Sequence, residues 1–282
     1  MASKNICASC IGVNVTEIVE TDNTKLPRWL ESIDYVSNFI DSVPLKKYKM
    51  SDYSVKLNLN VGKNKANKLM LYWGAQSSDK IIIDDAFDAY GDFSNYGVTK
   101  VNSEGNVTLY FNCPQPYSTI EMGETQRETF YRHIHFCFSD KSMKNWLAKV
   151  YTKIVVCNMK ILELISKHKN GEILLINTLP ASNYDKNHIP NSYNLHHNDI
   201  NIMSREELIE WMNIVIEDNY PVLDKLIKNG QLEVYELPIV VYCANKKCNL
   251  SQKAAIELYN KGFVNVRDFE DGMRGYNNYV KN

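Results

Sequence analysis

One cysteine stands where a thiol can act as a nucleophile, in the segment LPIVVYCANKKCNLSQKAAIELYNKGF at residues 237–263. An apolar β-branched run ends at Cys243, a short polar loop follows, and an Ala-rich amphipathic run begins near Ser251. Open α/β sheets bind ligands at this place, between the carboxyl end of a parallel strand and a helix N-terminus. Inward-pointing loop amides and the helix dipole there lower a thiol pKa from its free value of about 8.5. We therefore expect Cys243 to be a nucleophile at neutral pH.

The loop after Cys243 combines backbone amides with two lysines, a composition suited to an anion. Cys248, five residues after Cys243, has two interpretations: it closes a reversible disulfide with Cys243, or it is a small apolar filler at the helix start. The residues expected to bind an anion are Ala244, Asn245, Lys246, Lys247 and Asn249.

A second candidate site lies in the apolar run RHIHFCF, where His133 and His135 are two residues apart. In a strand, both side chains then lie on one face, which is a common way to present two imidazoles to one metal ion. Tyr117 is the expected third ligand, and the metal would be iron or zinc. In the competing interpretation both imidazoles are structural and bond to backbone groups or tyrosine hydroxyls.

Two different sequence patterns predict the helices and strands that would position these residues. After residue 157 strands and helices alternate, which predicts parallel strands joined by helical crossovers. Before it, short alternating or β-branched runs separated by Gly, Asn, Ser and Pro predict an antiparallel β-sandwich. The predicted helices are 158–168, 204–229 and 250–262; the predicted strands are 55–61, 68–74, 80–84, 106–113, 132–138, 153–157, 172–177, 237–243 and 264–269.

We therefore predict three parts: an irregular, partly helical segment at residues 1–50, a β-sandwich domain at 51–157, and an α/β domain with a central parallel sheet at 158–282. Cys7 and Cys10 form a lone CxxC in the first part, which lacks the further ligands that zinc requires, so we assign it no function.

Residues 158–282 resemble the rhodanese (thiosulfate sulfurtransferase) family in three segments that occur in the family's order. The segment LLINTLPASNYDKNHIPNSYNL looks like the opening strand and the His-Ile-Pro turn, here His188, Ile189 and Pro190. The strand IVVYC with its loop and KAA helix looks like the catalytic segment. The segment GFVNVRDFEDGMRGY looks like the closing strand and the final glycine turn.

The resemblance implies a central parallel sheet flanked by helices, with Cys243 as the catalytic residue. It implies a sulfurtransferase that moves sulfane sulfur from a small donor, such as thiosulfate or a persulfide, to a thiol acceptor. Cys243 would hold the sulfur as a persulfide, Cys248 could resolve it, and no cofactor would be required.

The segment departs from the family at several positions. Cys248 stands where active members usually have Arg, and the stretch from Cys243 to Ser251 is about two residues longer. Asn177 and Leu179 replace the common Asp and Arg of the opening strand. Two alternatives follow: an inactive rhodanese-like module that binds a protein partner, or a phosphatase or arsenate-reductase-like enzyme of this fold. The second lacks the Arg with which those enzymes bind an oxyanion.

Residues 90–140 weakly resemble the core of intradiol ring-cleavage dioxygenases, in which two Tyr and two His bind ferric iron. A Gly turn at Gly97, a strand, a Pro-rich turn with Tyr117 and the His133–His135 strand follow one another. Tyr90 is the nearest counterpart of the first tyrosine, at a spacing that is too short.

Composition excludes other classes of function. The 282 residues carry 32 Lys and Arg against 33 Asp and Glu, a net charge of -1, so the chain lacks the basic excess of a nucleic-acid-binding protein. No apolar run approaches the roughly 18 residues of a membrane span, and we expect no membrane partner. Seven cysteines, an odd number at irregular spacing, suit unpaired thiols in a reducing compartment. We therefore expect a cytoplasmic protein.

Overall fold

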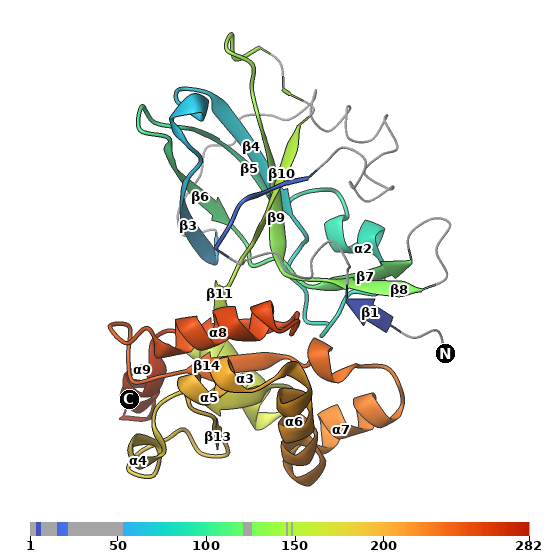
Figure 1. Cartoon of the computed structure of the whole chain (residues 1–282), viewed down its shortest axis with the longest axis vertical. Helices are drawn as coiled ribbons and strands as arrows, with labels where there is room; N and C mark the ends of the chain where they lie inside the picture. Colours follow the sequence, from blue (N-terminus) through green and yellow to red (C-terminus); the bar gives the residue numbers. More distant parts are fainter. Residues whose placement is uncertain are drawn as a thin grey trace. The chain divides into compact units, whose positions relative to one another are not determined.

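The computed structural model of the chain describes residues 4–6, 16–21, 53–120, 126–144, 146–147 and 149–281. Within this part of the chain, one compact unit ends at Val155 and a second begins at Val156 (Figure 1). Among the described residues, no helix is long and apolar enough to cross a lipid bilayer.

The C-terminal unit contains a five-stranded sheet in which every pair of neighbouring strands is parallel. Its apolar strands are buried on both faces, as expected where helices cover a parallel sheet on each side. The predicted parallel sheet is thus confirmed. In spatial order the strands are β11 (Cys157–Asn158), β15 (Val266–Phe269), β14 (Ile239–Tyr242), β12 (Leu174–Asn177) and β13 (Tyr193–Asn194).

Helices α3 (Ile161–Lys169) and α9 (Gly272–Lys281) contact each other and bury Leu164 and Met273 in a core with Leu175 and Val240 of the sheet. Helix α8 (Leu250–Asn260) contacts β14 and β15, and α5 (His197–Ile202) contacts α8 (Figure 1). The remaining short elements of the unit are α4 (Ala181–Tyr184) and the 3-10 helix η4 (Val234–Glu236).

The single helix predicted over residues 204–229 is wrong. The structure has α6 (Arg205–Asn219), capped by Ser204, and α7 (Pro221–Lys228). The break falls at Tyr220 because a proline has no amide for the helical ladder and disfavours helical geometry in the residue before it.

The described residues of the N-terminal unit form three small sheets. The five-stranded sheet is antiparallel throughout, the two-stranded sheet is antiparallel, and in the three-stranded sheet β1 runs parallel to β8. The five-stranded sheet has the order β2 (Val19–Thr21), β10 (Val150–Ile154), β9 (His133–Phe138), β4 (Leu69–Gly74) and β5 (Tyr96–Lys100). The others are β1 (Lys4–Ile6), β8 (Arg127–Phe130) and β7 (Tyr117–Ile120), and β3 (Val55–Asn60) with β6 (Asn106–Phe111). The unit also contains α2 (Ala86–Tyr90) and the 3-10 helix η3 (Lys63–Lys65).

The predicted antiparallel strands of this unit are confirmed, whereas the sandwich arrangement stays a prediction. Two details were wrong. The run at 80–84 is not a strand, since Ile83 makes only a single bridge to Tyr117. Residues 4–6 and 19–21 of the segment expected to be irregular are strands; residues 7–15, which include Cys7 and Cys10, and 22–50 lie outside the described residues.

The expectation that the cysteines are unpaired is also wrong for two of them. Cys113 and Cys157 are buried and disulfide-bonded, whereas Cys137, Cys243 and Cys248 are free. Disulfides persist in oxidising compartments, so the cysteine count no longer supports a cytoplasmic location. That location stays a prediction without this argument.

Candidate functional site

Cys243 directly follows β14, the middle strand of the parallel sheet. The strand before it is apolar and β-branched, and α8 begins seven residues later at Leu250, the predicted start of this helix. The Cys243 side chain is fully buried. The nucleophile candidate therefore lies at the carboxyl edge of the sheet, ahead of a helix, as the sequence indicated.

Two oxygen atoms contact the sulfur closely. The Cys243 thiol donates to the carbonyl oxygen of Cys248, with 3.2 Å between Sγ and O. The Ser251 hydroxyl donates to Sγ at 3.3 Å, and the Ser251 amide also bonds to the sulfur. The first turn of α8 thus supplies two donors to the sulfur, and the loop supplies a carbonyl acceptor that suits the protonated thiol.

Two other amides of the loop bond to Asn245 and not to the sulfur. Asn245 accepts the Lys247 amide on Oδ1 at 3.0 Å and the Cys248 amide on its backbone oxygen at 2.8 Å. Burial is the largest effect on the thiol and raises the pKa of Cys243, while the Ser251 contacts lower it. This direction is opposite to the expected one, because desolvation of the thiolate exceeds the stabilisation by the few donors that reach it.

The charged side chains of the loop lie on the surface of the domain. Lys246 pairs with Asp271 at 3.0 Å and with Glu270 at 3.6 Å, and these carboxylates raise the pKa of the Lys246 ammonium. Lys247 is exposed, and the Asn249 side chain makes no cap hydrogen bond although this residue precedes α8. Lys246 therefore ties the loop to the segment before α9, and both lysines stay on the surface.

The loop is held by the start of α9. The Met273 amide donates to the Cys243 carbonyl at 2.9 Å, and the Arg274 amide donates to the Ala244 carbonyl at 3.0 Å. Gly272 has a φ of 56°, and a Cβ there would overlap the backbone of Cys243 and Ala244. Only glycine allows this close approach without displacement of the loop.

Sequence reasoning missed two residues, Ser251 and Asp268. Asp268 lies in β15, is buried, and hydrogen-bonds to the Ser251 side chain. Burial raises the pKa of Asp268 to about 6, and its Oδ1 atom has no hydrogen-bond partner among the described residues. An acidic residue near the end of the predicted strand VNVRDF was the signal that could have indicated it. Cys243, Ser251 and Asp268 thus form a hydrogen-bonded chain.

The His-Ile-Pro turn is connected to the strand that carries Cys243. The Ile189 amide donates to the Tyr242 hydroxyl at 2.9 Å, and that hydroxyl also bonds to Ser192 Oγ at 2.7 Å. Asn177 takes the scaffold role at the opening strand, since its Oδ1 accepts the Leu179 amide at 2.9 Å. These contacts hold the end of β14 in place, one residue before the nucleophile.

Comparison with known proteins shows that residues 161–279 match the family model of the rhodanese-like domain. These residues form a rhodanese-like domain. The human single-domain sulfurtransferase TSTD1 is 14% identical, with 43% of this chain and 95% of that chain covered and a TM-score of 0.30. An uncharacterised protein from Saccharomyces cerevisiae is 15% identical, with 45% and 94% covered and a TM-score of 0.31. No curated protein matches the sequence.

The N-terminal unit brings the predicted metal ligands His133 and His135 together, with their Nε2 atoms 3.1 Å apart. Tyr117 contacts this pair through its ring, 5.8 Å from the His133 ring between centroids. Tyr90, excluded on spacing, contacts His133 directly, with its hydroxyl 3.0 Å from Nε2. The match to the rhodanese-like domain does not extend to these residues and gives the intradiol resemblance no support.

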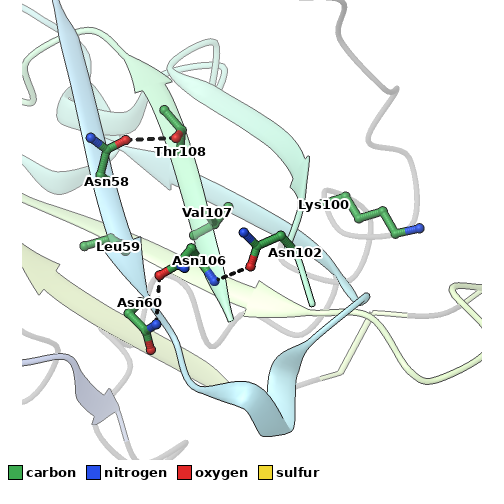
Figure 2. Close-up of a pocket in the computed structure, with 8 residues that line it drawn as sticks. All are labelled: Asn58, Leu59, Asn60, Lys100, Asn102, Asn106, Val107 and Thr108. Atoms are coloured by element: carbon green, nitrogen blue, oxygen red, sulfur yellow. Dashed lines mark hydrogen bonds between the residues drawn. The ribbon is translucent and has the colours of Figure 1, made fainter. Parts of the chain in front are cut away.

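A shallow pocket of about 500 Å³ lies on β3 and β6 of the N-terminal unit (Figure 2). Its asparagines bond to one another: Asn60 Nδ2 donates to Asn106 Oδ1 at 2.8 Å, and the Asn106 amide donates to Asn102 Oδ1 at 2.8 Å. No pair of titratable groups lines it, so this pocket offers no acid-base or nucleophilic chemistry. The lining residues are Asn58, Leu59, Asn60, Lys100, Asn102, Asn106, Val107 and Thr108.

Proposed function

We propose that the rhodanese-like domain is a sulfurtransferase that carries sulfane sulfur on Cys243. The observation that carries this proposal is the position of Cys243 after β14, with the Ser251 hydroxyl 3.3 Å from Sγ. It is the only cysteine at a strand end on the carboxyl edge of the parallel sheet within the described residues. A thiol at this place can attack a donor and return as a leaving group.

The first step is removal of the thiol proton. When the Ser251 hydroxyl donates to Asp268, its oxygen can accept the proton of Cys243 while its own proton passes to the carboxylate. Asp268, with a pKa of about 6, is a better proton acceptor than an exposed carboxylate near 4. Transfer of the Cys243 proton through Ser251 to Asp268 therefore offsets the burial that raises the pKa of Cys243.

The thiolate then attacks the outer sulfur of thiosulfate. The new bond joins Cys243 Sγ to that sulfur, the sulfur–sulfur bond of thiosulfate breaks, and sulfite leaves with the electron pair. An acceptor thiolate next attacks the outer persulfide sulfur and restores Cys243 as the leaving group. The products are the acceptor persulfide and the free enzyme, so no cofactor is consumed.

Cys248 is the candidate resolving thiol. It is free and half-buried, and its side chain hydrogen-bonds to that of Cys243. Its attack on the inner sulfur of the persulfide would form a Cys243–Cys248 disulfide and release hydrosulfide. Mass spectrometry of the unreduced peptide after persulfide formation tests this role. A disulfide that is lost in Cys248→Ser supports it, and a stable persulfide in the wild type assigns Cys248 to packing.

The decisive experiment is a persulfide assay. Purified protein is incubated with thiosulfate, the sulfane sulfur is released with cyanide, and thiocyanate is measured. We expect close to one sulfur per chain, absent in Cys243→Ser and retained in Cys137→Ser, a control at another free, buried thiol. Absence of cyanide-labile sulfur from the folded wild type, with thiosulfate or with a polysulfide donor, would reject the enzyme.

That negative result would favour the second candidate, an inactive rhodanese-like module that binds a protein partner. The full burial of Cys243 and its raised pKa are the observations behind it. A phosphatase or arsenate-reductase-like activity is a weaker alternative, since the loop from Cys243 to Ser251 contains no Arg for a tetrahedral oxyanion.

We also interpret the N-terminal unit as a β-sandwich in a cytoplasmic protein. The contacts between its sheets support the first part: β6 contacts β5, and the Tyr72 hydroxyl of β4 donates to the Tyr110 carbonyl of β6 at 3.0 Å. The cytoplasmic location is proposed from the sequence, in which no long apolar segment occurs.

A further inference from the structure

Three polar atoms converge in the interior of the N-terminal unit. His133 and His135 lie on one face of β9, and Tyr90 ends α2. All three residues are more than 90% buried, with 6%, 4% and 0% of their surface exposed. Their rings pack against one another and against Tyr117, whose ring centroid is 5.5 Å from that of Tyr90. The cluster does not belong to the rhodanese-like domain, and the proposed sulfur transfer does not use it.

The distances in the cluster match those between ligand atoms of one metal ion. The two Nε2 atoms are 3.1 Å apart, and the Tyr90 hydroxyl oxygen is 3.0 Å from Nε2 of His133. Ligands at about 2.0–2.2 Å from a metal, with angles between 90° and 110°, are roughly 2.8–3.6 Å apart. The two distances from Nε2 of His133, to Nε2 of His135 and to the Tyr90 hydroxyl oxygen, therefore suit ligands of one shared ion.

Two groups lie within hydrogen-bond distance of Nε2 of His133, the Tyr90 hydroxyl and Nε2 of His135. His133 Nδ1 lies 2.6 Å from the Tyr131 carbonyl oxygen, which only accepts, so Nδ1 carries the proton and Nε2 has a single lone pair. His135 can likewise carry its proton on Nδ1, directed at Thr152 Oγ1. In that tautomer both Nε2 lone pairs are free to bind one cation.

The outer nitrogens are already held as metal-binding histidines require. His133 Nδ1 bonds to the Tyr131 carbonyl, and His135 Nδ1 bonds to Thr152 Oγ1 at 2.8 Å, so both rings are oriented with Nε2 inward.

We propose that Tyr90, His133 and His135 bind one first-row transition-metal ion. Among the described residues, no group of three or more His, Cys, Asp or Glu could hold a metal. The third protein ligand of the proposed site is the phenol oxygen of Tyr90, which lies 3.0 Å from Nε2 of His133. Imidazole ligands suit iron, copper and zinc, and a site with three protein ligands leaves coordination positions open for water or a substrate.

The test measures metal binding by the full-length protein. Protein freed of metal with a chelator is titrated with zinc(II), cobalt(II) and iron(III) nitrilotriacetate, and retained metal and melting temperature are recorded. The titrations use the Cys243→Ser, Cys248→Ser background, because thiols also bind these ions. We expect one ion per chain for at least one metal and a rise in melting temperature that the chelator reverses. Bound iron(III) would add a visible absorption band from tyrosinate.

Two substitutions and one control assign the ligands. Tyr90→Phe removes a single oxygen atom from a buried ring, and His135→Gln removes one nitrogen ligand. Each should weaken binding at least about tenfold. Tyr72→Phe, which also removes a fully buried hydroxyl from this unit, should bind metal like the parent protein.

Two results would overturn the proposal. One is a folded parent protein that retains none of the three metals and shows no change in melting temperature. The other is binding that Tyr90→Phe leaves unchanged. If His135→Gln does not fold, Tyr90→Phe still decides, because it keeps the ring and its packing. Neither outcome bears on the persulfide assay, which concerns the other unit.

Discussion

The reactivity of Cys243 depends on two opposing effects. Removal of the sulfur from water favours the neutral thiol, whereas the hydroxyl and amide of Ser251 stabilise the thiolate. A hydrogen bond to a charged group contributes about 1.5–3 kcal/mol, which corresponds to one to two units of pKa. Ser251 therefore stabilises the thiolate of the buried Cys243 and makes this residue a better nucleophile.

Ser251→Ala should raise the pKa of Cys243 further and slow its alkylation near pH 8 by about tenfold or more, because the thiolate loses its hydroxyl donor. The measurement is the rate of Cys243 labelling against pH, followed by mass spectrometry. Ser192→Ala is the matched control, since Ser192 is buried in the same unit but bonds to Tyr242. Equal rates in wild type and Ser251→Ala would show that the contact does not stabilise the thiolate.

Asp268 makes stability depend on pH. Burial raises its pKa to about 6 from the ordinary 3.8, so the folded state resists ionisation more than the unfolded state does. The folded state therefore loses stability as pH rises from about 4 to about 6, and the loss is complete at pH 7.

Asp268→Asn should accordingly stabilise the protein at pH 7 by roughly 1–3 kcal/mol, and the difference from wild type should vanish below pH 4. Urea unfolding at several pH values measures it. A variant that is less stable than wild type at pH 7 would mean that the ionised carboxylate makes contacts in the folded state that exceed its burial cost.

The nucleophile loop depends on the helices at both of its sides. Helix α8 supplies Ser251, and the first amides of α9 bind the carbonyls of Cys243 and Ala244. The close approach of α9 requires the bare backbone of Gly272. The turn before α9 is thus part of the site, although none of its side chains contacts the sulfur in this arrangement.

Gly272→Ala should destabilise the rhodanese-like domain more than Gly171→Ala does. Both glycines have positive φ, 56° and 67°, so each substitution costs about 1–2 kcal/mol of backbone strain. A Cβ at Gly171 meets nothing within 4 Å, whereas one at Gly272 overlaps the loop. Thermal unfolding and the persulfide assay together test this. Equal effects of the two substitutions would show that the loop adapts without loss.

Each compact unit contains fully buried apolar side chains. In the C-terminal unit Leu164, Leu175 and Val240 belong to one core, whereas Tyr72, Phe111 and Phe136 are buried in the N-terminal unit. The domain boundary predicted between residues 157 and 158 rests on the change of sequence pattern. We predict that the two units have separate hydrophobic cores. Each unit then has its own free energy of unfolding.

We expect scanning calorimetry to resolve two unfolding transitions. Leu164→Ala should lower the stability of one by about 2–5 kcal/mol, because Leu164 is fully buried, and leave the other in place. Phe136→Ala should do the reverse. If either substitution shifts both transitions equally, the units unfold cooperatively and the proposed division does not describe the folding units.

The sequence alone was sufficient for the parallel α/β domain and for the position of Cys243, because both follow from local pattern. An apolar β-branched run, a polar loop and an amphipathic helix determine their own structure over about twenty residues. The rhodanese-like segments and most strands of the N-terminal unit could be identified for the same reason. Periodicity also placed His133 and His135 on one face of β9.

Only the tertiary structure could show which distant residues surround these positions. Asp268 reaches Ser251 because β15 lies beside β14, and Tyr90 reaches His133 across 43 residues of sequence. The direction of the Cys243 pKa shift was missed for the same reason. Motif spacing places a thiol near a helix dipole, which favours the thiolate. Burial by the surrounding chain opposes the thiolate and determines the direction in which the pKa of Cys243 shifts. Desolvation depends on every neighbouring element, and local sequence does not specify those neighbours.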